Sequence, residues 1–156
     1  MKKILIALDY DPTAQKVAEM GFSLGDNQHV EITLLHVIGN PSYYSPSVYD
    51  PIMGFGGFSN LDLLAPDMIN DLKNTSLHFL EKTKLHLGDN AIKILVKGGS
   101  TSEVILDTAK ELNAEIIVMG SHSKKWLDNI LMGSITEYVL HHTSIPLFII
   151  PTKKHG

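Results

Sequence analysis

Short apolar runs alternate along this chain with longer segments in which apolar residues recur at helical spacing. The runs are as short as strands and are dominated by Ile, Leu and Val, which is typical of strands buried on both faces of a parallel sheet. They cover residues 4–8, 30–37, 92–96, 116–119 and 147–150. The alternation predicts an α/β fold, a doubly wound five-stranded parallel sheet with helices on both faces.

Residues that start and stop helices stand at the borders of the helical segments. Asp11 precedes a proline, as an N-cap often does, and Ser-x-x-Glu patterns at Ser100 and Ser134 predict two capping boxes. Gly88 ends the longest helical pattern, and Asn113 can take the left-handed conformation that ends the helix after Ser100.

The length of 156 residues fits one domain, so we expect residues 1–156 to fold as a single unit. Within it, residues 39–65 show neither helical nor strand periodicity and are rich in proline, glycine and aromatic residues. Loops of this length are usually functional or disordered. We interpret residues 39–65 as a long loop insertion, either a lid or partner surface or a simple insertion.

Two glycines bracket the segment between the fourth strand and the last helix. Gly120 follows the run 116–119 and would let the backbone turn off the strand without a Cβ clash. Gly133, followed by Ser134, would let a ligand approach the first N–H groups of the helix. Those groups and the helix dipole favour an anion, most simply a phosphate. An ordinary helix start capped by Ser134 explains the same residues.

Two residues separate Gly120 from Ser123, and nine more separate Ser123 from Gly133, which Ser134 follows. This spacing resembles the nucleotide-binding fingerprint of the ATP-binding branch of the universal stress protein family. The family pattern has a glycine at the middle position, which Ser123 replaces here. Three further segments share the resemblance, which therefore covers nearly the whole chain: residues 3–9, 34–37 and 145–151.

The resemblance implies an adenine nucleotide alpha hydrolase-like fold with the strand order 3-2-1-4-5. This order reverses between the first and fourth strands, and open α/β sheets bind ligands beyond the carboxyl ends of the strands at such a point. Asp9 and Gly120 stand at these two ends. The nucleotide-site residues that the resemblance implies are Ala7, Leu8, Asp9, Val37, Met119, Gly120, Ser123, Gly133, Ser134, Ile135 and Thr136.

Individual residues of this set, and two lysines in the loop beside it, suggest particular contacts with a nucleotide. Asp9 can accept hydrogen bonds from ribose hydroxyls or hold a divalent cation; an Asx turn or a second cap would explain it as well. The backbone of Val37 would meet the adenine, by resemblance, while its side chain serves the core. Lys124 and Lys125, inside the loop, would either neutralise a triphosphate or be solvated surface lysines.

The sequence shows no catalytic or metal-binding constellation. It has neither a Gly-x-Ser-x-Gly elbow nor a Walker A motif, and His122 is the only general base that the loop offers. Without cysteines or a pair of histidines on one helical face, no metal site is predicted. His36, inside a strand, is interpreted as a core histidine with a hydrogen-bond partner. Any ATP hydrolysis is expected to be slow and incidental.

Net charge and hydropathy limit the classes of partner that the chain is expected to bind. The net charge of −4 disfavours nucleic acid, and no apolar run reaches the ~20 residues of a membrane span. The absence of cysteine fits a reducing cytoplasm, where we expect the protein to act. The apolar last strand, residues 147–150, would be a bare sheet edge, so we expect a homodimer formed through it.

The pattern and the resemblance together predict a cytoplasmic universal stress protein that binds ATP or AMP, with or without Mg²⁺, as a regulatory ligand and acts on an unknown protein partner. The alternative is a nucleotide-independent dimeric stress regulator or protein-interaction module. Ser123 and a self-capping Ser134 favour this alternative, whereas Gly120, Gly133 and Asp9 oppose it. A weak ATP hydrolase is a second alternative.

Overall fold

The computed structural model describes residues 1–25, 29–39, 66–121 and 132–152. The loop predicted over residues 39–65, Gly39 excepted, and most of the segment between Gly120 and Gly133 lie outside the described residues. All predicted strands are present, with ends within two residues of the predicted ones. In chain order the elements are β1 (Lys2–Ala7), α1 (Ala14–Ser23), β2 (Val30–Ile38), α3 (Pro66–Leu87), β3 (Lys93–Gly98), α4 (Thr101–Glu111), β4 (Ile116–Gly120), α5 (Ser134–His142) and β5 (Leu147–Ile150).

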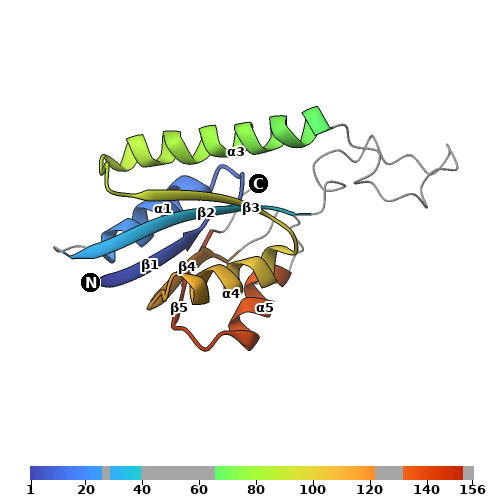
Figure 1. Cartoon of the computed structure of the whole chain (residues 1–156). Helices are drawn as coiled ribbons and strands as arrows, with labels where there is room; N and C mark the ends of the chain where they lie inside the picture. The colour runs from blue at the N-terminus through green and yellow to red at the C-terminus, as the bar shows by residue number, and fades with distance from the viewer. Residues whose placement is uncertain (26–28, 40–65, 122–131, 153–156) are drawn as a thin grey trace, which may run out of the picture.

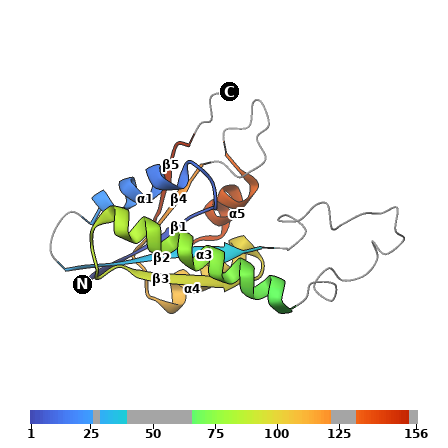
Figure 2. The same cartoon turned by 90° about the horizontal axis from the view of Figure 1, so that it is seen from above.

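The strands form one parallel sheet in the order β3-β2-β1-β4-β5, which confirms the predicted doubly wound fold. Helices α1 and α3 cover one face of the sheet, and α4 and α5 cover the other (Figures 1 and 2). The chain winds from β1 outward to β3 and then crosses back to β4 on the other side of β1. Strand order therefore reverses between β1 and β4, where Ile4 lies opposite Ile116.

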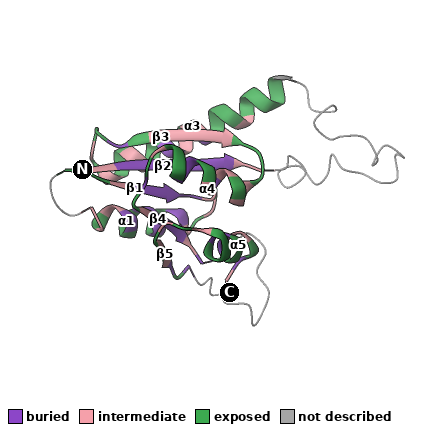
Figure 3. Ribbon diagram, turned by 60° about the horizontal axis from the view of Figure 1, so that its bottom comes forward, coloured by how far each residue is buried: buried purple, intermediate pink, exposed green. Residues whose placement is uncertain are grey.

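Side chains along each strand alternate between two apolar layers. Ile4 and Ile6 of β1 pack in the layer under α1 and α3, whereas Leu5 and Ala7 pack in the layer under α4 and α5. Figure 3 shows the buried residues concentrated in the central strands between the helices. Since burying a Leu or Ile contributes about 1.5–3 kcal/mol, these strands form a rigid base for the loops that leave their ends.

Helix α3 packs on the sheet mainly through its second half. Leu80 is fully buried and Phe79 half-buried, whereas Met68 and Ile69 near the start of the helix are exposed. No helix in the described part of the chain is both long and apolar enough to cross a membrane.

Helix starts agree only in part with the predicted capping residues. Asp11 holds the turn before α1, because its Oδ1 accepts hydrogen bonds from the N–H and the Oγ1–H of Thr13, each at 2.7 Å, although Thr13 is the N-cap. Ser100 is the N-cap of α4, but its hydroxyl makes no capping bond. The capping box at Ser134 is wrong: Gly133, with an extended backbone, is the N-cap of α5, so Ser134 already belongs to the helix.

Helix ends follow the prediction closely. Gly88 and Asn113 adopt the left-handed conformation after α3 and α4, with φ of 74° and 55°. The N–H of Gly88 donates to the carbonyl of Lys84 at 3.0 Å, and that of Asn113 donates to Lys110 at 3.1 Å. Such bonds satisfy carbonyls that the last turn of a helix leaves without a partner.

The hydroxyl of Thr108 is a polar group that α4 buries without compensation. The side chain is completely buried, and its Oγ1 has no hydrogen-bond partner among the described residues. We expect Thr108→Val to raise the free energy of unfolding by about 1 kcal/mol, because valine has nearly the same shape and no group to desolvate. Urea denaturation followed by circular dichroism measures the change.

Thr136→Val is the matched control for Thr108→Val. Thr136 is also buried in a helix, but its Oγ1 donates to the carbonyl of Gly120 at 2.8 Å. The same substitution there should lower the free energy of unfolding by about 1–3 kcal/mol. Equal destabilisation by the two variants would mean that the Thr108 hydroxyl has a partner in the folded protein.

Candidate functional site

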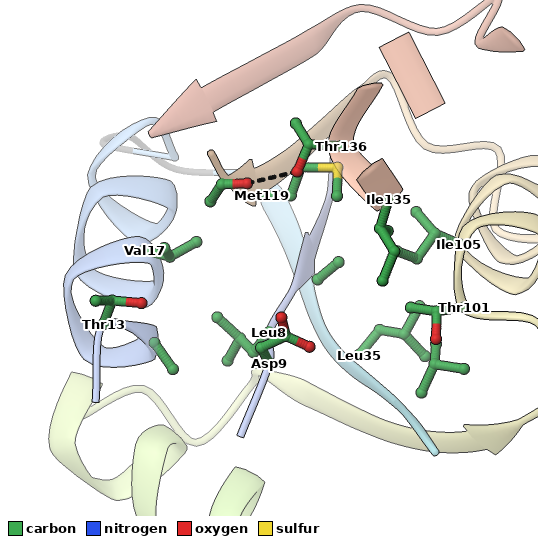
Figure 4. Close-up of a pocket in the computed structure, with 14 residues that line it drawn as sticks. Leu8, Asp9, Thr13, Val17, Leu35, Thr101, Ile105, Met119, Ile135 and Thr136 are labelled. Carbon is green, nitrogen blue, oxygen red and sulfur yellow. Dashed lines mark hydrogen bonds between the residues drawn. The ribbon is translucent and has the colours of Figure 1, made fainter. Parts of the chain in front are cut away.

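The carboxyl ends of β1, β2 and β4 meet α1, α4 and α5 around one cleft, which holds about 560 Å³ of empty space open to solvent. The cleft lies where strand order reverses, between β1 and β4. Figure 4 shows Leu8 and Asp9 between Val17 on the side of α1 and Ile105 on the side of α4. Of the predicted site residues, those that line this cleft are Ala7, Leu8, Asp9, Val37, Met119, Gly120, Ile135 and Thr136.

The three other predicted site residues do not line the cleft in the described part of the chain. Ser123 lies outside the described residues. Gly133 is buried at the start of α5, and its N–H donates to the carbonyl of Ser121 at 2.6 Å. Ser134 is exposed beside it. Because the N–H of Gly133 already donates to Ser121, that group is not a ready phosphate donor.

The first turn of α5 still presents backbone donors. No described side chain caps this helix, and none of the described residues accepts the N–H groups of Ser134, Ile135 and Thr136. The first N–H groups of a helix have no partner within the helix and lie at the positive end of its dipole. Ile135 and Thr136 both line the cleft, so these donors stand at its border.

Gly120 suits its position for a reason other than the predicted one. It is the last residue of β4, and its backbone is not left-handed, so no turn at this position demands a glycine. A Cβ built on Gly120 would instead lie 3.0 Å from Cγ2 of Thr152 and 3.1 Å from Cγ2 of Val17. The absence of a side chain thus lets α1 and the segment after β5 close on the end of β4.

Asp9 and Val37 stand at the ends of the strands that form the floor of the cleft. Asp9 is partly buried and follows Leu8, whose N–H donates to the carbonyl of Leu35 at 2.8 Å. The turn before α1 is held by Asp11, whose Oδ1 accepts the N–H of Thr13. Val37 is buried in the layer under α4 and α5.

The sequence did not single out the other residues that line the cleft. Leu35 shares a strand face with Val37, and Thr101 is the first residue of a helix that starts at the same edge of the sheet. Strand alternation and topology would have found both of them. The full set that was missed is Thr13, Ala14, Val17, Leu35, Thr101 and Ile105.

Ser121 connects the three elements behind the cleft. Its N–H donates to the carbonyl of Ile150 at 2.9 Å, and its Oγ accepts the N–H of Thr152 at 3.0 Å. With the bond from Gly133 to its carbonyl, Ser121 ties β4 to β5 and to the start of α5. Thr136 adds the bond to Gly120 that Figure 4 marks.

The described residues offer little for catalysis. They contain no group of three or more His, Asp or Glu side chains that could hold a metal ion. His36 is a core histidine with a hydrogen-bond partner, as predicted, since its Nδ1 lies 2.8 Å from the carbonyl of Leu8. His122, Lys124 and Lys125 lie outside the described residues.

Comparison with known proteins gives a match of residues 1–151 to the model of the universal stress protein family. Universal stress protein MJ0577 of Methanocaldococcus jannaschii is 28% identical over 155 residues, which cover 97% of this chain and 96% of the relative. Its solved structure superposes on the present one with a TM-score of 0.74 at 27% identity, covering 99% of this chain and 98% of that chain.

Two solved structures of similar fold contain nucleotides. A universal stress protein from Archaeoglobus fulgidus in complex with dAMP gives a TM-score of 0.61 at 20% identity and covers 96% of this chain and 98% of that chain. A universal stress protein in complex with cAMP gives 0.62 at 10% identity and covers 97% and 98%. At these identities the likeness is one of fold.

The close packing around Gly120 predicts a cost for any side chain at this position. Gly120→Ala would force Thr152 or Val17 to move, and we expect the free energy of unfolding to fall by about 1–3 kcal/mol. Gly98→Ala is the control, because a Cβ on that strand-end glycine would meet only the carbonyl oxygen of Ile38, at 3.8 Å. Thermal denaturation of both variants compares them. Equal melting temperatures would show that the end of β4 has room for a methyl group.

Proposed function

The chain belongs to the universal stress protein family, and on that premise we propose that it binds an adenine nucleotide, ATP or AMP, as a regulatory ligand in the stress response. The observation that carries the proposal is the cleft at the reversal of strand order, where the end of β1 faces the first turn of α5. Its lining is mostly apolar with a few polar groups, as in small-molecule sites. The dAMP and cAMP complexes of proteins with this fold give further support.

The start of α5 is the part of the cleft suited to phosphate. The N–H groups of Ser134, Ile135 and Thr136 have no acceptor among the described residues, and the helix dipole adds positive potential. Phosphate oxygens would accept from these groups rather than from Gly133, whose N–H already bonds to Ser121.

The opposite part of the cleft suits a nucleoside. The Asp9 carboxylate offers acceptors for ribose hydroxyls, and apolar side chains of Ala7, Val37 and Met119 offer a surface for the base. Asp9 is also a hard oxygen ligand for a Mg²⁺ ion, which would arrive with the triphosphate and keep most of its water. The ligand is proposed to regulate rather than to react, and any ATP hydrolysis is expected to be slow and incidental.

The edge strand β5 supports a homodimer as the form that carries this site. Phe148 is 42% exposed in the middle of β5, and Tyr138 and Leu140 of α5 are exposed as well. An apolar strand at the edge of a sheet is commonly covered by pairing, and a two-fold axis would pair β5 with its copy. The absence of cysteine fits the reducing cytoplasm in which we expect this dimer to act.

The bond between Gly133 and Ser121 favours a second candidate function. The N–H of the N-cap residue Gly133 already has an acceptor, and an exposed apolar edge strand lies nearby. Both features also suit a dimeric interaction module that needs no nucleotide. Nucleotide titration separates the two functions.

We expect the purified protein to bind ATP with a micromolar dissociation constant, which corresponds to about −8 kcal/mol. Asp9→Ala should weaken binding at least about tenfold, because ribose hydroxyls lose a charged acceptor. Asp107→Ala, which removes an exposed carboxylate from α4, is the control for net charge and should leave the affinity unchanged. Isothermal titration calorimetry measures all three. No heat and no thermal shift at millimolar ATP would leave the interaction module as the better function.

Phe148→Lys tests the dimer. A charge at the centre of the β5 edge should convert the dimer to a monomer at tens of micromolar protein, as read from the mass by light scattering. Leu85→Lys is the control, since Leu85 is 73% exposed on α3, which packs over β2 and β3 at the other edge of the sheet. A monomeric parent, or a dimer that persists in Phe148→Lys, contradicts assembly through β5.

A further inference from the structure

A polar side chain, that of His36, is buried in the apolar layer that separates the sheet from α1 and α3. His36 lies on β2 and is only 1% exposed. Its ring meets the ring of Phe79 of α3 edge-on, with centroids 5.9 Å apart and planes at 83°. Leu34 and Leu8 of the same layer are buried apolar residues. Burying a polar ring costs free energy unless it is hydrogen-bonded, so packing alone does not account for a histidine here.

The imidazole is bonded to the backbone just beyond the end of β1. Nδ1 of His36 lies 2.8 Å from the carbonyl oxygen of Leu8. Because a carbonyl oxygen only accepts, Nδ1 carries the hydrogen and donates it. The N–H of Leu8 donates in turn to the carbonyl of Leu35 at 2.8 Å. Leu8 is therefore held by β2 at both its N–H and its C=O, although β1 ends at Ala7.

The bond at Leu8 fixes the peptide unit that leads into Asp9. The carbonyl of Leu8 and the N–H of Asp9 belong to one planar trans peptide. A fixed carbonyl therefore restrains the plane from which the Cα of Asp9 departs, and so limits the directions that the Asp9 side chain can take. Leu8 and Asp9 both line the cleft, where Figure 4 shows them side by side.

We propose that His36 is a positioning residue that directs the Asp9 carboxylate toward the ribose hydroxyls of the bound nucleotide. His36 is not among the residues that line the cleft, so it acts through the backbone of Leu8 and Asp9. This inference rests on the proposed nucleotide function and extends it to a residue behind the cleft. The imidazole contributes selectivity for the ribose, whereas α5 contributes affinity for the phosphates.

The test compares the affinities for ATP and for 2′,3′-dideoxy-ATP in the full-length protein by calorimetry. In the parent, ATP binds more tightly because only ATP offers hydroxyls to Asp9. In His36→Leu, which removes the donor, the ratio of the two affinities should fall about fivefold or more toward one. Affinity for the dideoxy analogue should stay within about twofold of the parent, because the phosphate contacts are untouched.

Two further substitutions at His36 separate the hydrogen bond from the volume of the ring. In His36→Asn, the side-chain nitrogen is bonded to Cγ, as Nδ1 is in histidine, and it still carries a hydrogen. This variant should preserve the ratio of the affinities for ATP and the dideoxy analogue. His36→Gln stays polar but carries its amide one atom further from the backbone. We therefore expect the ratio of the two affinities to fall toward one, as in His36→Leu. In an Asp9→Ala background, His36→Leu should not lower the ratio of the two affinities further, because both changes remove the same contact with the ribose.

Ile32→Val controls for general loosening of the layer. Ile32 lies on the same strand and in the same apolar layer as His36, and its truncation removes one methylene without touching Leu8. The ratio should not change in this variant; a loss there too would assign the effect to packing and refute the role of the bond.

Three further outcomes overturn the inference or its premise. A folded His36→Leu or His36→Gln protein with the parental ratio overturns it, as does a parent that binds both nucleotides equally. A parent that binds neither nucleotide overturns the proposed function instead, before any variant at His36 is compared.

Discussion

The parallel pairing of β1 with β4 is the constraint on which the rest of the molecule depends. Because strand order reverses there, the connection after β1 passes over one face of the sheet through α1, and the connection after β4 passes over the other through α5. The two connections diverge beyond the carboxyl ends of the strands and leave the cleft between them. The position of the site follows from this topology before any single side chain is considered.

Backbone contacts give this edge of the sheet its shape. Gly120 lets Val17 and Thr152 approach the end of β4, and Ser121 then bonds to β5 and to the residue that starts α5. On the floor of the cleft, His36 and Leu35 hold the backbone of Leu8 in a similar way. The start of α5 and the backbone that leads into Asp9 are thus held by hydrogen bonds that lie behind the cleft.

The strands and helix ends could be predicted because their signals are local, whereas the strand order was implied by the family resemblance. Strands buried on both faces appear as apolar runs, and Gly88 and Asn113 adopt the left-handed stops that their positions suggest. The site was predicted less completely, because its geometry depends on contacts between distant parts of the chain. Nothing near Gly120 in the sequence reveals that Thr152 will lie against it, and a Ser-x-x-Glu pattern does not reveal that Gly133 takes the cap from Ser134.

The most direct test of nucleotide binding at the reversal of strand order is an NMR titration of the ¹⁵N-labelled protein with ATP. We expect the amide shifts to gather at Leu8 and Asp9, at Met119 and Gly120, and in the first turn of α5, with the opposite edge of the sheet unaffected. Shifts confined to surfaces away from these residues, or no shifts at millimolar ATP, would contradict a nucleotide site in this cleft.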